Sequence, residues 1–89
     1  MSEIKVTDNA AQTRFEAHLD SRLAGFADYV LGDGTIDFNH TEVDPGFGGR
    51  GVGSALVKGA LDAVRADGGL GVIATCPFVA SWIDKHPDY

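Results

Sequence analysis

Glycine is concentrated in one short stretch of the chain, and the hydrophobic pattern changes its period across that stretch. Five of the 12 glycines lie between Gly46 and Gly53. Before them, apolar and polar residues alternate, as in residues 14–19, which is typical of half-buried strands. After them, apolar residues recur at helical spacing from residue 52 to residue 63. The sequence therefore predicts strands that lead, through a glycine loop, into a helix.

These periods predict an antiparallel meander followed by one parallel crossover. In chain order we expect strands at residues 4–7, 14–19, 23–31 and 35–43, a helix at 52–67, a buried strand at 70–75 and a last helix at 78–85. Short turns join the first strands, and a strand–helix–strand unit requires a parallel return. In the strand at 23–31, Leu23 and Leu31 are expected on one face and Ala24 on the other. The predicted fold class is α/β, with a small mixed, mostly antiparallel sheet and two helices in a single domain of residues 1–89.

The strand at 35–43 contains a change of phase. Ile36 and Phe38 place the apolar face on even positions, whereas Val43 places it on an odd position. One extra residue between Phe38 and Val43 would reconcile the two halves, and such an insertion is a β-bulge. The alternative is that Val43 has already left the sheet on its way to Pro45.

Length and charge narrow the classes of function. A chain of 89 residues allows one compact domain. Seven Lys and Arg against 13 Asp and Glu give a net charge of −6, which argues against binding to nucleic acid or to anionic membranes. We see no secretory signal and no run of about 20 apolar residues that could span a membrane. A cytoplasmic protein is therefore expected, with Cys76 as a free thiol.

The glycine loop is a candidate phosphate site. The first turn of a helix leaves backbone N–H groups unpaired at the positive end of the helix dipole, and glycines let phosphate oxygens approach them. Arg50 could add a charge-assisted contact. A dinucleotide site would need an acidic residue at the end of the strand at 70–75, and a Walker A loop would need a lysine that the loop lacks. The remaining alternative is a flexible turn without a ligand.

Three stretches of the chain carry a family resemblance. Gly48-Gly49-Arg50-Gly51-Val52-Gly53 is similar to the acetyl-CoA pyrophosphate loop of the GNAT superfamily of N-acetyltransferases, Gln/Arg-x-x-Gly-x-Gly/Ala, with Gly48 in place of the usual Gln or Arg. The wider strings at residues 40–45 and 76–89 resemble the small YjdJ-like acetyltransferases, which are minimal GNAT domains. The resemblance implies a minimal GNAT-like fold and an acetyl-CoA-dependent N-acetyltransferase acting on an amine.

The resemblance also implies where acetyl-CoA binds. Its pantetheine arm and acetyl group would lie in a gap between residues 40–43 and residues 73–76. The backbone of Val43 would hydrogen-bond the acetyl or pantetheine end. The predicted cofactor-binding residues are Val43, Gly48, Gly49, Arg50, Gly51, Val52, Gly53 and Ser54.

Three residues are candidates for catalysis. His40 or Glu42 could take the proton of an ammonium acceptor, and Cys76 could accept the acetyl group or only contact the cofactor sulfur. The resemblance implies a tyrosine on the last helix that protonates the leaving thiolate. This helix has none, so the role is unfilled or falls to Cys76 or to water. Structural roles for all three stay open. The three histidines and one cysteine have no recognisable metal-ligand spacing.

The sequence leaves a second class of function open. A CoA-binding module with little catalysis, acting as a sensor or as the partner of another protein, would need the same loop. A nucleotide-binding or purely structural domain is the third possibility. The acceptor could be a small-molecule amine or an amine on a protein, and the chain could be a monomer or a homodimer.

Overall fold

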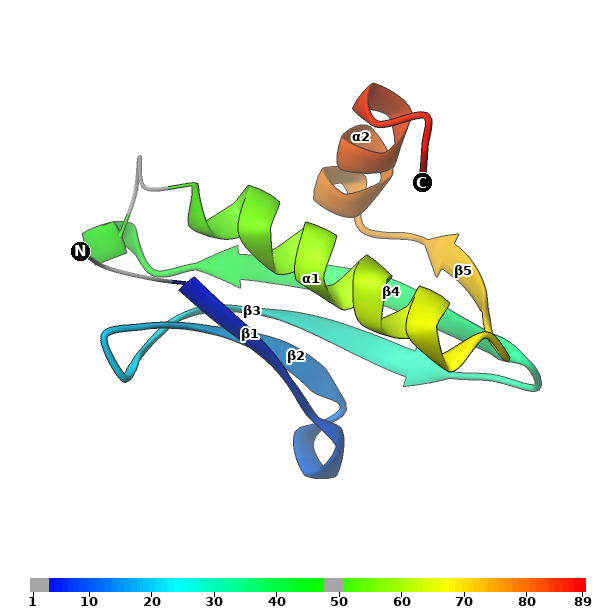
Figure 1. The fold of residues 1–89 in the computed structure, drawn as a ribbon, viewed down its shortest axis with the longest axis horizontal. Helices are drawn as coiled ribbons and strands as arrows, with labels where there is room; N and C mark the ends of the chain where they lie inside the picture. The colour runs from blue at the N-terminus through cyan, green and yellow to red at the C-terminus, as the bar shows by residue number, and fades with distance from the viewer. Residues whose placement is uncertain (1–3, 48–50) are drawn as a thin grey trace.

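The computed structural model describes residues 4–47 and 51–89, and these residues form one sheet with two helices (Figure 1). The elements of the described part are β1 (Ile4–Asn9), β2 (Arg14–Leu19), β3 (Arg22–Leu31), β4 (Thr35–Val43), α1 (Val52–Asp67), β5 (Gly71–Ala74) and α2 (Pro77–Lys85). The strand order is β1-β2-β3-β4-β5. Strands β1 to β4 pair antiparallel, and β5 pairs parallel to β4. The predicted α/β class and mixed sheet are confirmed.

Local sequence explains where these elements end. Asp20 and Ser21 both have positive φ, 53° and 66°, which matches the tight two-residue turn between β2 and β3. Helix α1 ends at Gly68, whose φ is 75° and whose N–H donates to the carbonyl of Val64. Helix α2 begins with Pro77, which lacks the N–H that a first helical residue does not use.

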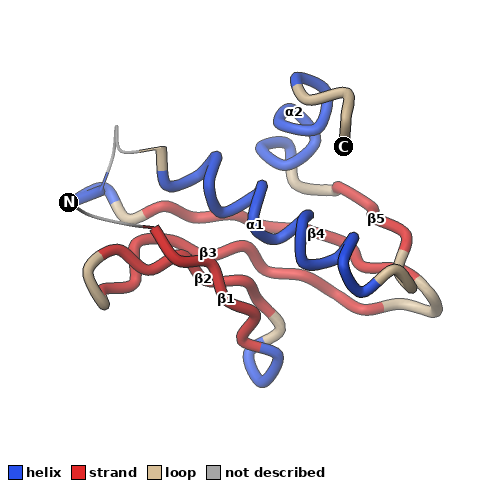
Figure 2. The backbone as a smooth tube through the Cα atoms, in the orientation of Figure 1, coloured by secondary structure: helices blue, strands red, loops and turns tan. Residues whose placement is uncertain are grey.

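Helix α1 packs against one face of the sheet, and Figure 2 shows it lying across β1 to β4. Between them lies the core, whose largest fully buried side chains are Phe38, Leu56, Val52, Val57 and Val79. In the described part of the chain, the other face of the sheet carries no helix; we call it the open face. No helix among the described residues is long and apolar enough to cross a bilayer.

Helix α1 packs closely on β1 at Gly59. A Cβ on Gly59 would lie 2.7 Å from Val6 Cβ and within 2.9 Å of both of its γ carbons. These atoms are branched directly at the strand and have little freedom to move away. Glycine at this position therefore sets how closely the helix can pack on the sheet.

A bulge in β3 changes which of its residues face the core. Ala17 pairs with Gly25 and the next residue of β2, His18, pairs with Leu23, so Ala24 is the extra residue. Ala24 is fully buried and Leu23 is 40% exposed. The predicted assignment of Leu23 and Ala24 to the two faces was wrong, because the bulge resets the alternation of side chains.

The predicted bulge in β4 is confirmed. Asp28 pairs with His40 and Tyr29 pairs with Phe38, which leaves Asn39 as the extra residue. Beyond it, Thr41 and Val43 point to the helix side of the sheet. His40 and Glu42 point to the open face. The bulge thus lies before His40 and does not separate His40 from Glu42.

Strand β5 is an edge strand, and the prediction that it is buried was wrong. Val72 and Ile73 are 40% and 47% exposed. Among the described strands, only β4 pairs with it. An apolar sequence is compatible with a central strand or with an edge strand. Because β5 lies at the edge of the sheet, its side chains are in contact with water.

Candidate active site

The two parallel strands of the sheet part halfway along β4. Their pairing runs from Thr35 and Gly71 to Phe38 and Ala74. Figure 1 shows the chain leaving the sheet after β5, toward α2, while β4 continues along the sheet to the end where α1 begins. Among the described strands, residues 40–43 therefore have β3 on one side and no partner on the other.

The predicted gap is present, but its far wall differs from the prediction. Ile73 and Ala74 belong to the paired part of the strands, so the gap begins only at Thr75 and Cys76. The Thr75 hydroxyl donates to the Asp37 carboxylate at 2.7 Å, and the Cys76 N–H donates to the Phe38 carbonyl at 2.9 Å. These two bonds hold the chain at the point where the strands separate. The start of α2 forms the rest of the wall.

Cys76 is the N-cap residue of α2 and is 5% exposed. Its Sγ lies 3.4 Å from the hydroxyl oxygen of Thr41 on β4. Burial by itself raises the pKa of this thiol. Hydrogen bonds from Thr41 and from the N–H groups of Phe78 and Val79 lower the pKa, and their effect is larger than that of burial. The net effect is a lowered pKa, so a larger share of the sulfur is thiolate at neutral pH than in a free cysteine.

Replacing Thr41 by Val should raise the pKa of the Cys76 thiol. Valine keeps the shape of the side chain but removes the hydroxyl that can donate to the thiolate, which disfavours the charged form. The pKa follows from thiolate absorbance recorded against pH, with Cys76→Ala as the blank, since the chain has one cysteine. A titration that is unchanged in Thr41→Val would show that the hydroxyl does not act on the sulfur.

His40 and Glu42 form a pair on the open face. His40 Nε2 lies 3.5 Å from Glu42 Oε1, and their side chains are 54% and 63% exposed. The Phe26 ring lies beside that of His40, with 6.2 Å between centroids, and the Arg14 guanidinium lies 4.6 Å from the centre of the Phe26 ring. The structure therefore brings His40 and Glu42 together, whereas Cys76 lies on the helix side of β4.

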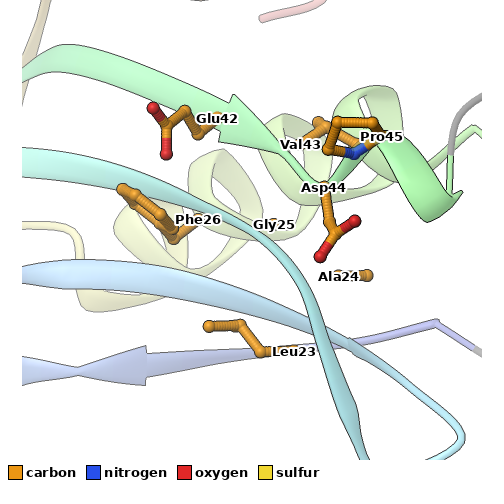
Figure 3. A pocket seen from close by; sticks show the side chains of 8 residues that line it. All are labelled: Leu23, Ala24, Gly25, Phe26, Glu42, Val43, Asp44 and Pro45. Carbon is orange, nitrogen blue, oxygen red and sulfur yellow. The ribbon is translucent and has the colours of Figure 1, made fainter.

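A pocket of about 410 Å³ opens beside Glu42 (Figure 3). Its walls come from the ends of β3 and β4, and its lining residues are Leu23, Ala24, Gly25, Phe26, Glu42, Val43, Asp44 and Pro45. Figure 3 shows the side chains of Glu42 and Phe26 close together at one end. The Asp44 N–H donates to the carbonyl of the bulged residue Ala24 at 2.8 Å, so the bulge helps to shape the pocket.

The start of α1 lies near the end of β4. Its N-cap residue is Gly51, with φ of 73° and no side chain that caps the helix. A ring atom of Phe78 would lie 2.7 Å from a Cβ on Gly53, and Val43 also lies close to that position. The side chain of Val52 is buried in the core, so only its backbone is available to a ligand. The predicted ligands Gly48, Gly49 and Arg50 lie outside the described residues.

Sequence reasoning missed several residues of this region. Phe26 is one of them, because a lone aromatic residue in a strand does not by itself indicate a site. Thr41 was also missed, because it meets Cys76 only through the tertiary fold. Ser54 was predicted as a cofactor-binding residue, but its contact with Trp82 was not. The pocket depends on the bulge at Ala24, for which the sequence contains no signal.

Parallel strands that separate beside a helix start, on a small mixed sheet, define a minimal N-acetyltransferase fold. Residues 14–89 match the sequence model of a family described as GCN5-related N-acetyl-transferase. Protein NATD1 of Xenopus tropicalis is 32% identical over 89 residues, an alignment that covers 97% of this chain and 80% of NATD1. The chain belongs to the GCN5-related N-acetyltransferase family. The narrower likeness to YjdJ-like acetyltransferases stays a prediction.

Proposed function

We propose that the protein is an acetyl-CoA-dependent N-acetyltransferase that moves an acetyl group to an amine. The observation that carries this proposal is the separation of β4 and β5 after Phe38 and Ala74. The gap has Cys76 on its far wall, and family membership supports an acetyl transfer there. The proposed acceptor is an amine on a small molecule or on a protein.

The described residues fit the arm of CoA. No described strand pairs with β4 at residues 40–43 on the side of the gap, so the backbone there is available to an extended ligand, and Val43 is the proposed contact. The uncapped first turn of α1 offers N–H groups of Val52, Gly53 and Ser54 to a pyrophosphate. Gly48, Gly49, Arg50 and Gly51 complete the proposed loop. When bound, acetyl-CoA supplies the activated acetyl group.

His40 and Glu42 are the proposed acceptors of the amine's proton. An ammonium group must lose a proton before its nitrogen can attack the thioester carbon and form the new C–N bond. The adjacent pocket contains the Glu42 carboxylate and the apolar side chains of Leu23 and Phe26, which suits an amine on an apolar stem. A thioester in the gap would be accessible from both faces of β4, so the acceptor can approach from the open face.

Cys76 is the proposed group at the thioester sulfur. As the C–S bond breaks, its thiol can donate a proton to the departing thiolate, or it can accept the acetyl group first and pass it to the amine. His40 and Glu42 lie on the opposite face of β4, so Cys76 depends on Thr41 and the start of α2 for its thiolate character. Detection or absence of an acetyl adduct on Cys76 distinguishes the two roles.

Acetyl-CoA should raise the melting temperature by about 10 °C or more. At about 100 times its dissociation constant a ligand adds about 2.7 kcal/mol to the free energy of unfolding. Each kcal/mol shifts the midpoint of a domain of this size by roughly 4–8 °C. Thermal unfolding with acetyl-CoA, and with ATP and NADH as controls, measures this.

No shift with millimolar acetyl-CoA would contradict the proposal. Equal shifts with ATP would favour a nucleotide-binding domain instead. A shift with acetyl-CoA but no transfer to any amine would favour the CoA-binding module, the second candidate, which the absence of a tyrosine in α2 supports.

A further inference from the structure

A single side-chain hydrogen bond connects α2 to the first turn of α1. The Trp82 indole N–H donates to Ser54 Oγ at 2.9 Å. Ser54 is the third residue of α1 and is exposed, whereas Trp82 is 7% exposed. The bond thus ends at the helix turn where the pyrophosphate of CoA is proposed to bind.

Neighbouring rings hold the indole in place. The His86 ring stacks on Trp82 with 3.8 Å between centroids and 13° between planes. Tyr89 meets the indole edge-on at 5.0 Å. His86 Nδ1 also lies 2.7 Å from the Trp82 carbonyl oxygen, which ties this ring to the helix end. The direction of the indole N–H is therefore set by packing on several sides.

This bond leaves the Ser54 hydroxyl with its proton to donate. A serine hydroxyl has one donor and two acceptor positions, and an indole N–H can only donate. Trp82 thus takes one acceptor position of Ser54 and cannot take its proton. On the first turn of a helix, where the dipole favours anions, the natural acceptor for that proton is an anionic oxygen.

We infer that Trp82 is a positioning residue that orients the Ser54 hydroxyl as a donor to the pyrophosphate of acetyl-CoA. The inference rests on the proposed function, because it assumes that the pyrophosphate binds at the start of α1. It adds to the backbone N–H groups a side-chain donor held from another helix. Ser54 touches the ligand, and Trp82 acts through Ser54.

The test uses the one tryptophan of the chain as its own probe. In ¹H–¹⁵N spectra, CoA should shift the Trp82 indole signal, whereas pantetheine, which lacks the pyrophosphate, should leave it in place at equal concentration. Ser54→Ala should abolish the CoA-induced shift and weaken CoA binding by about tenfold, as expected for a hydrogen bond to a charged group. Trp82→Phe keeps an aromatic ring but removes the N–H, and should weaken CoA binding in the same direction. Ser81→Ala, an exposed serine of α2, is the matched control and should bind CoA as the wild type does.

The outcomes separate this inference from the proposed function. If CoA shifts backbone amides at the start of α1 but Ser54→Ala binds CoA as tightly as the wild type, the inference fails and the proposed function stands. If CoA shifts no signal of the wild type at millimolar concentration, both fail. Because Ser54 is exposed, its alanine variant decides the matter even if Trp82→Phe does not fold.

Discussion

Changing both His40 and Glu42 to Gln should lower kcat/KM for acetyl transfer by about 10²- to 10⁴-fold, the usual contribution of a positioned base. Glutamine preserves size and polarity but cannot take a proton from the acceptor. The measurement is release of CoA thiol from acetyl-CoA with a polyamine, a lysine side-chain amine and a peptide α-amine as acceptors. CoA binding should be retained, because both side chains lie on the open face, opposite to the face covered by α1.

The open face contains a matched control for this variant. His18 and Glu16 form a second His–Glu pair with the same spacing in sequence, with His18 Nε2 3.7 Å from Glu16 Oε1, on β2 and away from the gap. Changing both of these to Gln should leave transfer near the wild-type rate. If both double variants lose the same activity, the loss is caused by the changed charge of the open face and not by the removal of a base beside the gap.

Replacing Gly59 by Val should lower the free energy of unfolding by about 3 kcal/mol, the upper end of the range for overpacked sites. The new Cβ would lie 2.7 Å from Val6 Cβ, and two further methyl groups would add to the overlap. Helix α1 would have to move away from β1, which exposes core side chains. Thermal and urea unfolding measure the loss, and a decrease of roughly 12–24 °C in the melting temperature is expected.

Two further variants test this explanation. Gly69→Ala, for which the nearest atom would be Asp67 Oδ2 at 3.5 Å, should change stability little. Adding Val6→Ala to Gly59→Val should recover part of the loss, because it removes the atoms that the valine meets. If the losses in unfolding free energy caused by Val6→Ala and Gly59→Val simply add, contact with Val6 is not the reason why residue 59 must be glycine.

The elements of this fold could be predicted because each has a clear period or a clear end. The bulge in β4 was predictable as well: Ile36, Phe38 and Val43 are separated by polar residues, so the change of phase is visible. In β3, Leu23, Ala24 and Gly25 are consecutive and none is polar, so no alternation records the bulge there. Periodicity alone locates a bulge only where apolar and polar residues alternate both before and after it.

The candidate site was predictable in part for the same kind of reason. The gap and the shared face of His40 and Glu42 follow from local sequence and family resemblance, whereas the phosphate loop stays a prediction. The contact between Cys76 and Thr41 joins residues 35 positions apart, and the bond between Trp82 and Ser54 joins residues 28 apart. No local pattern encodes such contacts. The exposure of Val72 and Ile73 likewise depends on which strand ends the sheet.

The extra residue at Asn39 has a consequence for how this sequence can change during evolution. Deleting one residue between Phe38 and His40 would exchange the two sides of the rest of β4. His40 and Glu42 would then turn toward the helices, and Thr41 and Val43 would turn toward water. Such a deletion would remove the contact between Thr41 and Cys76 and take the His–Glu pair off the open face in one event. Homologous genes should therefore tolerate insertions and deletions in the turn at residues 32–34 far more readily than in this strand.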